Sequence, residues 1–119
     1  MRPRDSRGRI RASIAIAAIT SAFIAGRAFY RAPLELVALV MVLVSAAWIL
    51  GLVVLALGRP YGFYIAATSG LLLVNARMFS QLPGDDPYTW VAEVAFAMLG
   101  YVFSTFEAVI AWKSVKSRG

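Results

Sequence analysis

Three charged side chains inside apolar stretches of this chain have the types and spacing to do chemistry. Arg77 lies six residues before a polar turn that begins at Pro83. Glu93 lies six residues after that turn ends at Pro87. A charge within a membrane span is costly and needs a partner or a purpose. In an antiparallel hairpin the two depths match, so we predict a buried Arg77–Glu93 ion pair. The pair either fixes the hairpin register or forms part of an ion or proton site.

Glu107 is the third of these charges, and it shares a helical face with Glu93. Glu93, Gly100 and Glu107 are seven residues apart, which is close to two turns of an α-helix. The two carboxylates therefore project from one face with a small residue between them. Such a face could line a path for cations or protons. The alternative is a local salt bridge at each end of the helix, with Glu107 at a depth similar to Arg59 and with Lys113 nearby.

The residue inventory excludes most enzyme chemistry. The chain has no cysteine and no histidine, which removes Cys/His zinc sites and Ser-His-Asp catalysis. It also lacks the glycine-rich motifs that bind nucleotide phosphates. We therefore expect no enzyme activity, no cofactor and no metal site.

A long uncharged segment defines the class of protein. Residues 36–57 are 22 residues without a charge, and about 20 apolar residues of helix cross the hydrocarbon core of a bilayer. Hydrophobic residues make up 61% of the 119-residue chain, against about 45–50% in soluble domains. The composition indicates several membrane spans in a single integral membrane domain covering residues 1–119.

We predict an all-α, polytopic membrane protein that folds as a compact antiparallel bundle of four transmembrane helices. The predicted spans are 12–30, 36–57, 61–82 and 88–112. The turns at 58–60 and 83–87 contain the glycine and proline residues typical of helix ends. The first segment, 12–30, allows three interpretations, because it is alanine-rich and contains Arg27. It either spans, lies on the membrane surface as an amphipathic helix, or is a signal peptide.

The distribution of basic residues predicts the topology. Net charge is +6, and the positive charges gather in an N-terminal segment, 1–11, and a C-terminal tail, 113–119. Basic residues flank spans on the cytoplasmic side. Four spans place both basic segments and Arg59 on that side, so we expect a multi-pass protein of the cell membrane with both termini cytoplasmic. This explains the basic segments without a nucleic-acid partner.

Small residues at four-residue spacing predict how the helices pack. In lipid, close approach through small side chains replaces the hydrophobic drive for helix association. Such stripes occur at Gly62, Ala66 and Gly70, at Gly100, Ser104 and Ala108, and at Ala18, Ala22 and Gly26. They serve either a tight bundle or self-association. The expected partners are the lipid bilayer and either further copies of the chain or other membrane subunits.

These features favour a structural or accessory subunit of a membrane assembly. One alternative is a homo-oligomeric small transporter or channel in which Glu93 and Glu107 line a cation or proton path. In length and span number the chain resembles the small multidrug-resistance transporters, which place an essential glutamate in the middle of their first span; this chain has none there. A second alternative is a filament subunit similar to the hydrophobic hairpin pilins of conjugation systems, with 58–60 as the basic turn between two apolar helices.

Overall fold

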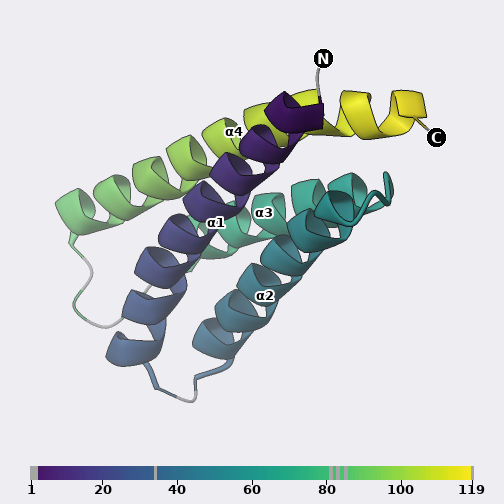
Figure 1. Cartoon of the computed structure of the whole chain (residues 1–119). Coiled ribbons are helices and arrows are strands. Elements are labelled where there is room, and N and C mark those ends of the chain that lie inside the picture. Colours follow the sequence, from purple (N-terminus) through teal and green to yellow (C-terminus); the bar gives the residue numbers. More distant parts are fainter. Residues whose placement is uncertain (1–2, 34, 81, 83, 85, 119) are drawn as a thin grey trace.

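Four α-helices make up the fold. The structure is a computed structural model that describes residues 3–33, 35–80, 82, 84 and 86–118. The helices are α1 (Pro3–Arg31), α2 (Leu36–Ala56), α3 (Gly62–Met78) and α4 (Pro87–Arg118). Helix α1 packs on α2 and α4, and α3 packs on α2 and α4, so that the four form a bundle (Figure 1). The predicted all-helical fold with four helices is confirmed.

Three of the described helices are long and apolar enough to cross a membrane. They are Gly8–Arg31 with 24 residues, Leu36–Ala56 with 21 and Pro87–Ser117 with 31. Helix α3 has 17 residues, which gives a length of about 26 Å at 1.5 Å per residue. That is shorter than the roughly 30 Å hydrocarbon core of a bilayer. The predicted third span, 61–82, is therefore shorter as a helix than expected, and four transmembrane helices are not confirmed.

The first and last helices, α1 and α4, continue into the basic ends of the chain. Helix α1 begins at Pro3 and α4 ends at Arg118, beyond the predicted spans 12–30 and 88–112. Much of each basic segment is thus helix that extends a span. As a result Arg9 lies on the same helix as the apolar residues that follow it.

Glycines bring the backbones of α2 and α3 into contact. A Cβ atom at Gly62 would lie 2.5 Å from the carbonyl oxygen of Gly51. A Cβ atom at Gly51 would in turn lie 2.5 Å from the amide nitrogen of Ala66. Gly58, at φ 90°, makes the turn that follows α2, in a conformation that favours glycine. The small residues at the start of α3 therefore pack against α2.

An aromatic group joins α2, α3 and α4 further along the bundle. Trp48 is 1% exposed, and its ring centroid lies 6.2 Å from that of Tyr101. The Tyr101 hydroxyl donates a hydrogen bond of 2.9 Å to the carbonyl oxygen of Ala67. A Cβ atom at Gly70 would lie 2.6 Å from the Tyr101 ring, so the third residue of the α3 stripe makes room for this ring.

The small residues of α4 pack against α1. Gly100 lies against the side chain of Thr20. Ser104 and Ser13 exchange hydrogen bonds, because each hydroxyl donates to the other residue's carbonyl oxygen, at 2.7 Å from Ser13 and 3.0 Å from Ser104. Ala108 is 2% exposed. This surface, here called the α1–α4 seam, is thus built from small and hydroxyl side chains.

The stripe expected on the first span does not pack inside the bundle. Ala18, Ala22 and Gly26 are exposed, and a Cβ atom at Gly26 would meet nothing within 4 Å. The buried face of α1 contains Ala17 and Ile24 instead. Alanine occurs on every side of this helix, so four-residue spacing alone did not identify the packed face.

Candidate functional site

Charged side chains from three helices meet at one end of the bundle. Glu93, in the second turn of α4, contacts Arg77 in the last turn of α3. The Arg77 Nε lies 3.3 Å from Glu93 Oε1, and Arg77 Nη2 lies 3.4 Å from Glu93 Oε2. The structure thus brings together Arg77 and Glu93, the two residues that were expected to pair because they lie at equal distances from the turn. The guanidinium contacts the carboxylate at two points, which is the strongest geometry for this pair of groups.

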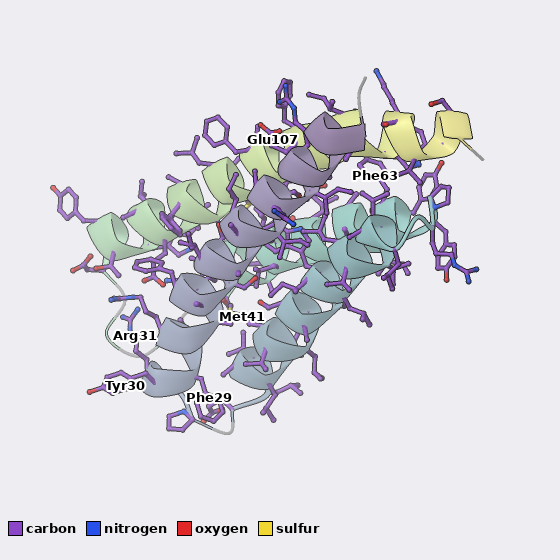
Figure 2. All side chains as sticks on the ribbon, in the orientation of Figure 1. Phe29, Tyr30, Arg31, Met41, Phe63 and Glu107 are labelled. Carbon is purple, nitrogen blue, oxygen red and sulfur yellow. The ribbon has the colours of Figure 1, made fainter. Side chains whose placement is uncertain are left out.

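Two further arginines, both on α1, contact the same carboxylate. Arg31 Nη1 lies 3.2 Å from Glu93 Oε2, and Arg27 Nε lies 3.7 Å from it. Figure 2 labels Arg31 at the C-terminal end of α1, and Glu107 of α4 near the opposite end of α1. Sequence reasoning paired Glu93 with Arg77 alone and missed Arg27 and Arg31, whose nearest acidic residue along the chain is Glu35. Glu35 is exposed, and the carboxylate that Arg27 and Arg31 contact is that of Glu93.

The four residues form a cluster that is buried at its centre and open at one edge. Arg77 is 0% exposed and Glu93 2%, whereas the Arg31 and Arg27 side chains are 14% and 45% exposed. We call this group of three arginines and one glutamate the arginine cluster. Arg27 forms its exposed edge.

Glu107 forms a separate ion pair at the other end of the seam. Arg9 Nη1 lies 2.9 Å from Glu107 Oε2, with the two side chains 41% and 23% exposed. The partner is Arg9 rather than Arg59 or Lys113, which depth matching suggested. Helix α1 starts earlier than predicted and carries Arg9 along α4, which explains the difference.

The seven-residue spacing of Glu93, Gly100 and Glu107 does place all three on one face, and that face is turned toward α1. Between the two carboxylates, however, side chains fill the seam. Thr20 lies against Gly100, and Ser13 bonds to Ser104. The two carboxylates therefore serve two local ion pairs at opposite ends of a packed helix–helix contact.

The role of the arginine cluster is argued from its geometry, because no similar protein indicates one. Comparison with protein-family models, curated proteins and solved structures found no match. The cluster joins the ends of α1, α3 and α4 through one carboxylate, so its first consequence is to fix how these three helices lie together.

The Arg9–Glu107 pair should contribute little to stability. Arg9→Gln is expected to lower the free energy of unfolding by less than about 1 kcal/mol, because both side chains are partly exposed and such pairs are screened by solvent. Unfolding of the detergent-solubilised protein by sodium dodecyl sulfate, followed by tryptophan fluorescence, measures the change. A loss above about 2 kcal/mol would instead assign this pair a central part in packing α1 on α4.

Proposed function

We propose that this chain is a small integral membrane protein with four membrane-embedded helices and cytoplasmic termini. We propose further that it acts as a structural or accessory subunit of a membrane assembly. The observation that carries the proposal is that the carboxylates on the α1–α4 contact are paired with arginines. Each carboxylate in the seam is engaged by arginines of the same chain, and Glu93 is engaged by three.

The direction of the helices supports a fourth crossing by α3. Helices α1 and α4 are antiparallel, since Arg9 pairs with Glu107 at one end and Arg31 with Glu93 at the other. Helix α2 follows α1 after a short connection and packs beside it. If α1, α2 and α4 all cross the bilayer, then α2 and α4 run in the same direction. The chain must return between them, and α3 is the segment available to do so.

Burial of the central carboxylate supports the accessory role over transport. A carboxylate that carries a proton or cation must bind and release it during each cycle. Glu93 is 2% exposed and lies among three guanidinium groups. Removing a buried ion's partners is strongly destabilising, so this arrangement favours a fixed structural contact.

Helix α2 offers a surface for a neighbouring membrane subunit. Three outward leucines of α2 and the leucine at its C-terminal cap are seven residues apart and 60–77% exposed: Leu36, Leu43, Leu50 and Leu57. Apolar residues repeated every seven positions form one continuous stripe along a helix and suit packing against another helix. We call this the leucine stripe, and we propose it as the contact face of the assembly.

The composition of the particle extracted in mild detergent tests the proposal. Native mass spectrometry of the tagged protein from its own membrane is expected to show fixed-ratio association with other membrane subunits. Leu43→Ala should weaken that association, whereas Leu71→Ala, an equally conservative change at a 50% exposed site on α3, should not. A pure homo-oligomer that transports cations or protons when reconstituted into lipid vesicles would overturn the accessory role in favour of a transporter. Extracellular fibres would overturn it in favour of a pilin.

A further inference from the structure

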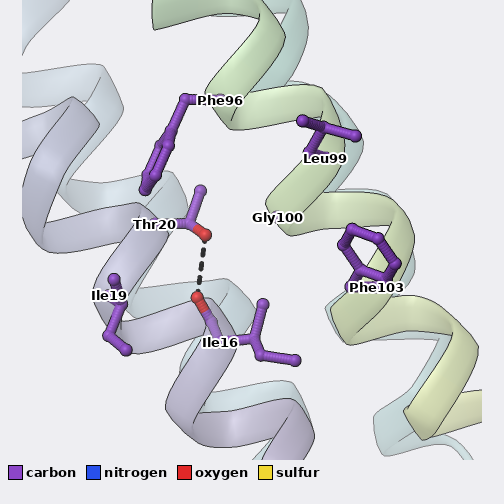
Figure 3. A pocket seen from close by; sticks show the side chains of 7 residues that line it. All are labelled: Ile16, Ile19, Thr20, Phe96, Leu99, Gly100 and Phe103. Atoms are coloured by element: carbon purple, nitrogen blue, oxygen red, sulfur yellow. Dashed lines mark hydrogen bonds between the residues drawn. The ribbon is translucent and has the colours of Figure 1, made fainter.

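An apolar groove opens along the outer side of the α1–α4 seam (Figure 3). It has a volume of about 250 Å³. Its walls are Ile16, Ile19 and Thr20 from α1 and Phe96, Leu99 and Phe103 from α4. The Thr20 hydroxyl donates a hydrogen bond of 2.8 Å to the carbonyl oxygen of Ile16. The one hydroxyl in the wall is thereby satisfied within its own helix, so the groove suits an apolar occupant.

One end of this groove leads to the arginine cluster. Phe96, in the groove wall, packs on Phe23 with ring centroids 4.7 Å apart. The Arg27 guanidinium lies 5.5 Å from the centroid of the Phe23 ring, and its side chain is 45% exposed. The seam therefore presents an apolar groove, then two aromatic rings, then the exposed guanidinium of Arg27.

We propose that the α1–α4 seam binds one anionic phospholipid, with the headgroup phosphate on Arg27 and an acyl chain in the groove beside Gly100. This inference depends on α1 and α4 lying in a bilayer and not on the accessory role. It commits to a lipid because the groove is apolar and outward-facing. It commits to an anionic one because the exposed group at the end of the groove is the Arg27 guanidinium, which lies 3.7 Å from a carboxylate that Arg31 and Arg77 approach more closely.

The dimensions fit one leaflet. Ile16 and Arg27 are eleven residues apart on α1, which is about 16 Å at 1.5 Å per residue. Half of a roughly 30 Å hydrocarbon core is about 15 Å. A chain that enters beside Arg27 at the headgroup level reaches Ile16 near the middle of the bilayer. Guanidinium–phosphate contacts are charge-assisted hydrogen bonds, while the same positive charge repels the choline of a zwitterionic headgroup.

A lipid titration of the full chain tests the headgroup part. Native mass spectrometry in mild detergent would compare phosphatidylglycerol with phosphatidylcholine of the same acyl chains. We expect one phosphatidylglycerol to bind at least fivefold more tightly than phosphatidylcholine. Arg27→Gln should lower the affinity for phosphatidylglycerol about fivefold, the equivalent of about 1 kcal/mol per basic residue near a membrane surface. Arg11→Gln, an exposed arginine on the same helix outside the groove, should leave it unchanged.

A second variant tests the groove itself. Ile19 is 63% exposed, so Ile19→Trp can fill the groove without disturbing the core, and it should weaken the binding of both lipids. Leu71→Trp, at a 50% exposed position on α3 outside the groove, is the matched control. Equal binding of the two lipids, equal losses in Arg27→Gln and Arg11→Gln, or full competition by inorganic phosphate would each overturn the proposal. The first two results would indicate a non-selective lipid shell, and the last a free-anion site.

Discussion

Replacing Glu93 by glutamine is expected to destabilise the bundle by roughly 3–5 kcal/mol, the range measured when one partner of a buried ion pair is removed. The substitution leaves the size of the side chain almost unchanged but removes the negative charge that Arg27, Arg31 and Arg77 all contact. Arg77 is 0% exposed, so its charge cannot turn to water without moving α3. Unfolding by sodium dodecyl sulfate, monitored by tryptophan fluorescence, measures the loss.

A matched control and a double variant make this prediction specific. Glu107→Gln removes the same charge from the same face of α4 but from a partly exposed pair, so its effect should stay below about 1 kcal/mol. Adding Arg77→Met to Glu93→Gln should recover part of the lost stability, because it removes a buried charge that has lost its partner. Equal effects of the two glutamate variants, or no recovery in the double variant, would contradict a central role for Glu93.

The hairpin contact was predictable from the sequence because it depends on local counting. Arg77 and Glu93 are each six residues from the same turn, and the equal distance is enough to bring them to one depth. The contacts of Arg27 and Arg31 with Glu93 could not be predicted by counting residues along the chain. Their approach to Glu93 depends on α1 packing beside α4, a contact between segments more than sixty residues apart.

The end of α3 was not predictable from hydropathy for a related reason. The predicted span continues to residue 82, but α3 ends at Met78. Side chains donate hydrogen bonds to two backbone carbonyl oxygens at this end of the helix. The Trp90 indole nitrogen of α4 donates a hydrogen bond of 3.2 Å to the carbonyl oxygen of Met78. Arg77 donates one of 3.3 Å to the carbonyl oxygen of Ser80. Carbonyl groups at a helix end need such partners. Trp90 supplies one from α4, whereas the hydrogen bond from Arg77 is local to the segment that follows α3.

The packing faces of the helices were also only partly predictable from the spacing of small residues. Gly100 and Ser104 of the α4 stripe pack against α1, and the start of the stripe on α3 packs against α2. On α1 alanine is too frequent for spacing to distinguish one face. There the hydrogen-bonding side chain Ser13 and the close contact of Thr20 with Gly100 identify the packed side.

Adding a single methyl group at Gly62 is expected to separate α2 from α3 and lower the free energy of unfolding by about 2–3 kcal/mol. The new Cβ would lie 2.5 Å from the Gly51 carbonyl oxygen and 2.5 Å from the Leu55 amide nitrogen. Both are backbone atoms, which cannot rotate away as a side chain could, so one helix must move. Gly26→Ala is the control, because its Cβ meets nothing within 4 Å; with no contact to disturb, replacing a helical glycine should stabilise the protein by about 0.5–1 kcal/mol. If Gly62→Ala also proves neutral or stabilising in the same unfolding assay, the close backbone contact that joins α2 to α3 is wrong.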